Sequence, residues 1–115
     1  MKTIRINRAK WLRGSVGGNN NYLWCSERQA GCCLGHAIHQ TAKCSWNDLR
    51  NKPTPPFYYS KPSFLTKFEP YGFTSNHFAD EAMSINDAND ISEEQREKLL
   101  TALFAENNIK LKFYN

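Results

Sequence analysis

The two ends of the chain carry short segments in which polar and apolar residues alternate. Residues 2–6 and 109–113 each place their apolar side chains at every second position. The apolar positions are Ile4, Ile6, Ile109, Leu111 and Phe113. A period of two is typical of a strand that is buried on one face only. Because such a strand needs helices to cover its apolar face, the sequence predicts a small sheet that contains both ends of the chain.

Between these ends, three segments have the apolar spacing of amphipathic helices. They cover residues 32–42, 76–86 and 93–106. The last is the clearest, because Ser92 and Gln95 form a capping-box pattern in front of it. Its predicted inward side chains are Leu99, Leu100, Leu103 and Phe104. With 115 residues in all, the chain is predicted to be a single α+β domain, residues 1–115, with about three helices on the small sheet.

The region around the first helix gives further local predictions. Residues 22–25 are predicted to form a second strand, and residues 26–31 a hairpin or strand-to-helix turn. Asn7 and Ser45 are placed to cap short helical turns. Gly35 lies inside a predicted helix, where glycine costs about 1 kcal/mol relative to alanine. We therefore expect another part of the backbone to approach the helix closely at this glycine.

The positive charge of the chain is concentrated in its first half. Residues 1–50 carry eight Lys or Arg and two acidic residues, and residues 51–115 carry seven and nine. A cluster of arginines around one aromatic ring is compatible with phosphate contacts and base stacking. The candidate nucleic-acid residues are Arg5, Arg8, Lys10, Trp11 and Arg13. A solvated basic surface is the alternative interpretation.

The cysteines and histidines allow two chemical hypotheses. Cys32, His36, His39 and Cys44 are residue types that zinc binds, but they crowd one helix and its flank. A cysteine at the start of a helix, Cys32 or Cys33, could be a nucleophile with His77 as its base. The competing interpretation is that at least two of the four cysteines lie in the core, since free cysteine is usually buried. We favour that interpretation and therefore predict no metal site, no cofactor and no enzymatic activity.

Residues 57–74 are rich in aromatic side chains and are interrupted by Pro62, Pro70 and Gly72. Aromatic residues concentrate in the cores of protein interfaces. The candidate partner-binding residues are Phe57, Tyr58, Tyr59, Phe64 and Phe68. Simple packing of these rings into the core is the alternative.

Several short motifs together resemble small proteins of tailed bacteriophages and prophages. They are residues 10–14 (KWLRG), 22–23 (YL), 32–35 (CCLG), 84–87 (SIND), 92–97 (SEEQRE) and 109–113 (IKLKF). The resemblance implies a phage accessory protein in the cytoplasm of a bacterial host, and it brings no established activity. Phage proteins of this size commonly inhibit host machinery or host defence, and some are themselves sensed by bacterial immune proteins and trigger them.

We therefore expect a non-enzymatic protein that binds a host bacterial protein and is a monomer when free. The alternative is a small basic regulator that binds nucleic acid. No run of apolar residues is long enough for a membrane span, and the basic start of the sequence lacks the apolar core of a signal peptide. Neither a membrane partner nor secretion is expected.

Overall fold

The computed structural model describes residues 2–14, 22–41, 45–51 and 76–115. The described elements are the strand β1 (Lys2–Asn7), a short 3-10 turn η1 (Arg8–Lys10), the helices α1 (Cys33–Thr41), α2 (Trp46–Leu49), α4 (Asn76–Asp87) and α5 (Glu93–Glu106), and the strand β2 (Ile109–Tyr114). This is the predicted α+β architecture, in which the sheet is formed by the two ends of the chain. None of the described helices is long and apolar enough to cross a membrane.

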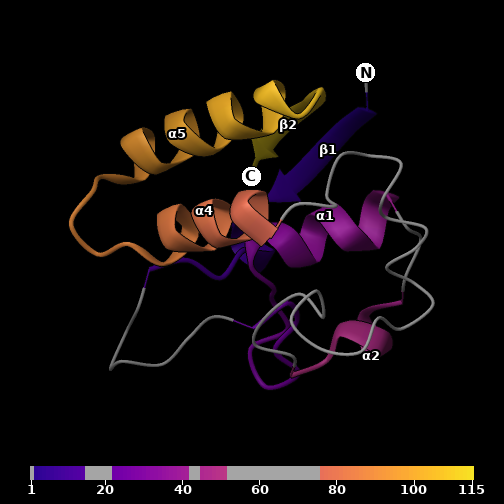
Figure 1. Cartoon of the computed structure of the whole chain (residues 1–115). Helices are drawn as coiled ribbons and strands as arrows, with labels where there is room; N and C mark the ends of the chain where they lie inside the picture. Colours follow the sequence, from indigo (N-terminus) through magenta and orange to yellow (C-terminus); the bar gives the residue numbers. More distant parts are fainter. Residues whose placement is uncertain (1, 15–21, 42–44, 52–75) are drawn as a thin grey trace.

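The strands β1 and β2 pair in parallel, and the register places Ile4 beside Leu111 and Arg5 beside Lys112. Parallel neighbours need a long connection, which here is the body of the chain. Helix α5 packs on β2 and helix α1 packs on β1, while α4 contacts both helices. In Figure 1, α4 and α5 run side by side and β2 lies behind α5. The helices thus cover the apolar face of the sheet, as the one-sided strands require.

The helix starts follow from capping residues in the sequence. The side chains of Asn7, Ser45 and Ser92 accept hydrogen bonds from backbone N–H groups at the starts of η1, α2 and α5. Each cap satisfies a donor that has no partner within its helix. The predicted caps are confirmed, and α5 begins and ends where the capping-box pattern and the apolar spacing predict.

The predicted strand at residues 22–25 is wrong. Among the described residues, Trp24 and Cys25 form only isolated bridges, to Arg50 and Ala30. The reason is a close approach to helix α1: a Cβ atom built on Gly35 would lie 1.8 Å from the carbonyl oxygen of Leu23. The segment is therefore held against a helix rather than against a neighbouring strand. The close backbone approach that was predicted at Gly35 is confirmed.

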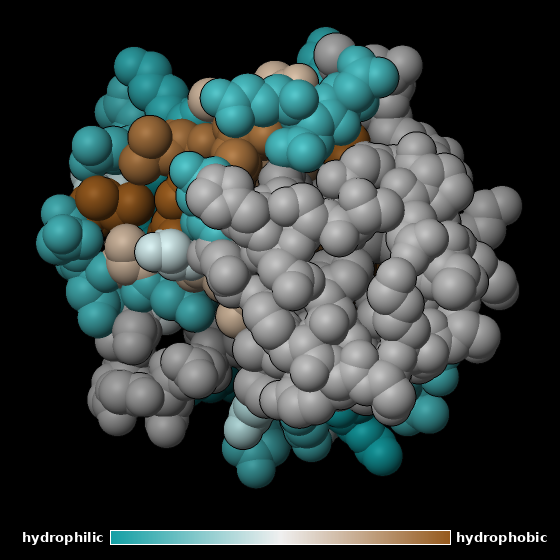
Figure 2. Space-filling model, in the orientation of Figure 1, coloured by the Kyte–Doolittle hydropathy of each residue, from teal (hydrophilic) through white to brown (hydrophobic). Residues whose placement is uncertain are grey.

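The core lies between the sheet and the helix layer. Its largest fully buried side chains are Phe104, Ile4, Ile6, Leu23, Leu34, Ile38, Leu49, Leu100 and Ile109. Leu99 departs from the prediction, because it is 41% exposed. The buried positions of α5 are Arg96, Leu100, Leu103 and Phe104, so the buried arc of the helix is narrower than its run of apolar residues. Figure 2 shows apolar surface among the hydrophilic side chains on the face of α5 that is turned to the viewer.

Candidate functional site

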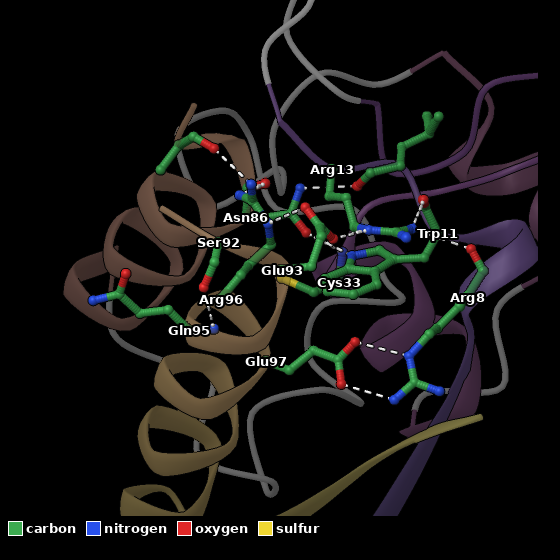
Figure 3. Close-up of polar contacts among 12 residues, drawn as sticks. Arg8, Trp11, Arg13, Cys33, Asn86, Ser92, Glu93, Gln95, Arg96 and Glu97 are labelled. Carbon is green, nitrogen blue, oxygen red and sulfur yellow. Dashed lines mark hydrogen bonds and ion pairs between the residues drawn. The ribbon is translucent and has the colours of Figure 1, made fainter. Parts of the chain in front are cut away.

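A buried asparagine joins three segments that are far apart in the sequence. Asn86, near the end of α4, is fully buried. Its Oδ1 accepts hydrogen bonds from Nε1 of Trp11 at 2.8 Å and from the backbone N–H of Cys33 at 3.1 Å. Its Nδ2 donates to the carbonyl oxygen of Leu12 at 3.0 Å. The backbone carbonyl oxygen of Asn86 accepts a hydrogen bond from the N–H of Gly14 at 2.8 Å. The Asn86 side chain thus provides an acceptor for a backbone N–H at the start of α1 and holds the segment after β1 in place (Figure 3).

A buried arginine holds the loop between α4 and α5. Arg96 is 3% exposed. Its guanidinium group donates to the carbonyl oxygens of Ile85 and Asn86 at 2.8 Å each and of Ala88 at 2.7 Å. A buried charge needs such partners, because its desolvation is costly. Arg96 and Asn86 therefore form one continuous buried connection, which we call the Asn86–Arg96 network.

Two glutamates of α5 extend this network to the surface. Glu93 is paired with Arg13 and with Arg96. Partial burial raises the pKa of Glu93, but the hydrogen bond and positive charge of Arg13, together with Arg96, outweigh this effect and leave the pKa below its ordinary value. Glu97 accepts two hydrogen bonds of 2.8 Å from Arg8. This hydrogen bonding raises the pKa of Arg8. No local sequence pattern shows these pairs, because the arginines lie 89 and 80 residues earlier in the chain.

The candidate nucleic-acid residues divide into two groups. Arg8 and Arg13 are paired with glutamates, and Arg13 also lies over the ring of Trp11 at 4.5 Å. Trp11 is 4% exposed and donates to Asn86, so its ring packs inside the protein. Arg5 and Lys10 are exposed. The structure therefore does not bring the five residues together as one accessible surface.

A different basic cluster forms on the sheet. Arg5, Lys110 and Lys112 are exposed, and Arg5 lies beside Lys112 in the parallel register. Their side chains point away from the helices, because the buried Ile4, Ile6, Ile109 and Leu111 alternate with them. The alternation at residues 109–113 predicted exposed lysines, but only the pairing of β1 with β2 shows that Arg5 is their neighbour.

The cysteines behave as core residues. Cys25, Cys32 and Cys33 are free and buried, which confirms that at least two of the four cysteines belong to the core. Burial raises the pKa of Cys32 to about 12 and raises that of Cys33 well above its ordinary value. This direction is opposite to the one that a nucleophilic thiolate needs. The interior that surrounds both thiols outweighs any effect of the helix start.

The two histidines of α1 have partners other than a metal. His36 is 4% exposed, and its Nε2 donates to the carbonyl oxygen of Lys10 at 2.8 Å. Burial lowers the pKa of His36, although the Lys10 carbonyl opposes that shift. His39 stacks on Trp46 with the ring centroids 4.0 Å apart, and Trp46 in turn stacks on Trp24. Within the part of the chain that the structure describes, no group of three or more Cys, His, Asp or Glu could hold a metal ion.

Two sets of predicted residues lie outside the described residues. The first set is the group of aromatic partner-binding candidates, Phe57, Tyr58, Tyr59, Phe64 and Phe68. Cys44, from the zinc hypothesis, and the His77 side chain, from the thiol hypothesis, belong to the second. These predictions stay predictions.

A shallow, open hollow of about 450 Å³ lies on the exposed side of α5, next to Phe113 near the end of β2. We call it the α5–β2 groove, and it is lined by Glu94, Glu97, Lys98, Thr101, Ala102, Ala105 and Phe113. One end is fixed by the pair of Glu97 with Arg8 and by the packing of Phe113 on Trp11, whose ring centroids lie 4.7 Å apart. The network described above therefore shapes this end of the groove.

Sequence reasoning missed the groove. Thr101, Ala102 and Ala105 are small exposed helix residues and carry no chemical signal of their own. Phe113 was assigned to the inner face of a strand, where it is in fact half-buried. Comparisons of the chain with protein-family models, with curated proteins and with solved structures find no match.

Proposed function

We propose that this protein is a non-catalytic binding protein and that another protein docks in its α5–β2 groove. The observation that carries the proposal is the groove itself, an accessible hollow that is lined by one strand and one helix. The charged side chains of the Asn86–Arg96 network are held by internal hydrogen bonds, whereas Thr101, Ala102 and Ala105 face the hollow.

The composition of the groove supports a protein partner. Small side chains and Phe113 form its lining, and Glu94 and Lys98 add charges of both signs. Protein interfaces commonly combine an apolar centre with a polar rim. The half-buried Phe113 ring, which is held by Trp11, supplies a rigid aromatic surface of the kind that interface hot spots use.

The resemblance to phage proteins supports a host bacterial protein as the partner, met in the bacterial cytoplasm. Binding there would serve host takeover, anti-defence, or recognition by a host immune protein. We also propose that the free protein is a monomer, because its groove is then open to the partner.

The experiment is a tagged pull-down from nuclease-treated bacterial lysate, read by mass spectrometry. The test variant is Ala102→Arg, which fills the groove with a long charged side chain. The matched control is Leu99→Arg, at another exposed position of α5 that does not line the groove. We expect the wild type and Leu99→Arg to retain the same protein, and Ala102→Arg to lose it while keeping its thermal melting temperature. Equal retention by all three proteins would reject the groove as the docking site.

A second candidate function, binding of a nucleic acid, is favoured by the exposed cluster of Arg5, Lys110 and Lys112. Contacts with phosphates make affinity fall steeply with salt concentration. If this function is correct, capture from the lysate disappears after nuclease treatment, and the double variant Lys110→Glu, Lys112→Glu abolishes binding to an RNA or DNA oligonucleotide. Salt-independent capture that survives nuclease treatment supports the protein partner instead.

A further inference from the structure

The two outer edges of the small sheet are treated differently. At the β1 edge, the N–H of Arg5 donates to Oε1 of Gln40 at 2.9 Å, and Nε2 of Gln40 donates to the carbonyl oxygen of Arg5 at 2.6 Å. The Gln40 side chain thus occupies the position of a neighbouring strand. Among the described residues, β2 pairs only with β1, and none of them covers its other edge as Gln40 covers that of β1.

The direction of the β2 backbone groups follows from the same contact. Since the N–H and C=O groups of Arg5 point to Gln40, those of Ile4 and Ile6 point to β2. The parallel register then directs the backbone groups of Lys110 and Lys112 toward β1. Those of Leu111 and Phe113 therefore point to the open edge. Backbone groups that do not pair within a sheet are a template for a further strand.

The open edge and the α5–β2 groove coincide. Among the residues whose side chains the structure describes, the groove is lined by α5 and by Phe113 of β2. Since α5 precedes β2 through a tight turn at Asn107 and Asn108, the helix and the strand run antiparallel, and the groove extends along α5 and meets β2 at Phe113. A third strand added beside β2 would lie under this flank of α5, with alternate side chains directed into the groove.

We infer that the protein binds its partner by strand addition: an extended segment of the partner pairs with the open edge of β2 and extends the sheet to three strands. This inference rests on the proposed function and names its mode of binding. Main-chain hydrogen bonds to Leu111 and Phe113 would supply affinity, and the side chains that enter the groove would supply specificity.

The charges on β2 define the chemistry of the added segment. One face of the added strand meets the groove, where Thr101, Ala102, Ala105 and Phe113 favour small apolar side chains. Its other face lies beside Lys110 and Lys112, where acidic side chains are favoured. The partner segment is therefore an extended stretch in which apolar and acidic residues alternate.

A second copy of this chain fits the edge poorly. Two β2 strands placed edge to edge would bring the lysines of both copies onto one face, and like charges on neighbouring strands are destabilising. Lysines on an edge strand are a known protection against such self-association. The inferred occupant is thus a segment of another protein.

The test uses the full chain, labelled with ¹⁵N, and an octapeptide of alternating glutamate and valine. Amide hydrogen exchange is followed residue by residue. When nine-tenths of the protein is bound, we expect the exchange of the Leu111 and Phe113 amides to slow by about tenfold, since a tenth of the molecules remains free. The amides of Lys110 and Lys112, which face β1, serve as internal references and should change little.

Three matched peptides separate strand addition from simple attraction. Placing the glutamates in one block keeps the charge but destroys the alternation, and replacing glutamate by lysine reverses the charge. N-methylation at alternate residues removes the donors from one edge of the peptide. We expect the first two changes to weaken binding. N-methylation of one set of alternate residues, either the glutamates or the valines, should prevent binding, and N-methylation of the other set should not. Equal binding of the alternating and block peptides, or no protection of Leu111 and Phe113, would overturn the inference.

The outcomes also separate this inference from the proposed function. If Ala102→Arg abolishes capture of the host protein but that protein leaves the Leu111 and Phe113 amides unprotected, the groove binds its partner without strand addition. Suppose instead that the peptide protects the Leu111 and Phe113 amides, but that the wild type and Ala102→Arg capture the host protein equally well. The edge of β2 then binds strands, but the groove is not the site of the proposed function. Formation of a homodimer that protects both amides would contradict the inference of a foreign partner.

Discussion

Helix α5 is used differently along two of its faces. Toward the loop after α4, it directs Arg96 into the interior, where the guanidinium group meets three carbonyl oxygens. Toward β2, it presents Thr101, Ala102 and Ala105 to an open groove. The first face contains the charged and polar residues that attract attention in the sequence, and the second contains residues without chemical character. In this protein, the polar motifs build the scaffold, and the binding surface that we propose consists of small residues beside a strand edge.

The largest effect is expected when the scaffold side is broken at Asn86. Asn86→Ala leaves the indole N–H of Trp11, the N–H of Cys33 and the carbonyl of Leu12 without their partner. Each unsatisfied buried group costs about 1–3 kcal/mol, and we expect a total loss of about 3–5 kcal/mol in the free energy of unfolding. Urea denaturation measures it, with the exposed Asn47→Ala as the control. A loss below about 1 kcal/mol would show that the network is not part of the scaffold.

The next effect concerns the close approach at Gly35. A Cβ atom on this residue would lie 1.8 Å from the Leu23 carbonyl oxygen, and that oxygen belongs to the backbone. Gly35→Ala should therefore destabilise the protein by about 1–3 kcal/mol, although alanine favours a helix by about 1 kcal/mol relative to glycine. Thermal or urea unfolding distinguishes the two effects by the sign of the change. A stabilised variant would mean that the segment 22–25 is not held against α1.

The local and the distant parts of this fold differ in how well the sequence predicted them. The bounds of α5 depend on Ser92 and on nearby apolar spacing, so they were predictable. The burial of Arg96 depends on where the carbonyls of residues 85–88 point, which no local pattern records. Likewise, residues 22–25 have the composition of a strand but lie against Gly31 and Gly35 of a later segment.

The groove was beyond prediction for a related reason. It lies beside β2, which pairs in parallel with β1, while Gln40, from α1, covers the β1 edge of the sheet. Neither the parallel pairing nor the contact of Gln40 has a sequence signal. The candidate residues that sequence reasoning selected were those with conspicuous chemistry, and Trp11, Arg13, Cys32 and His36 have internal partners or buried positions.

A smaller effect should appear in the pH dependence of stability. Burial lowers the pKa of His36 in the folded state below its ordinary value of about 6.5. The unfolded chain therefore binds more protons between these two pKa values, and stability falls as the pH drops below about 6.5. His36→Gln keeps a donor for the Lys10 carbonyl but does not titrate, so its unfolding free energy should depend less on pH between about 5 and 7. His39→Gln is the control. An unchanged slope in His36→Gln would mean that His36 is protonated as readily in the folded as in the unfolded state.

The smallest effect on stability is expected on the binding side. Ala102 is exposed, and Ala102→Arg should change the free energy of unfolding by no more than about 0.5 kcal/mol. Binding of the alternating octapeptide should nevertheless weaken by about tenfold or more, because the new side chain occupies the groove. Isothermal titration and urea unfolding of the same samples give both numbers. If Ala102→Arg lost both stability and binding, the groove face of α5 would also be part of the scaffold, and the difference between the two faces of α5 would be contradicted.

Amide hydrogen exchange of the free protein tests the central claim most directly. The account predicts that the Arg5 amide, which donates to Gln40, and the Lys112 amide, which faces β1, exchange slowly. The Leu111 and Phe113 amides should exchange much faster, because they face an open edge. Protection of Leu111 and Phe113 equal to that of Lys112 would show that the edge is already covered in the free protein, and would contradict a binding site at β2.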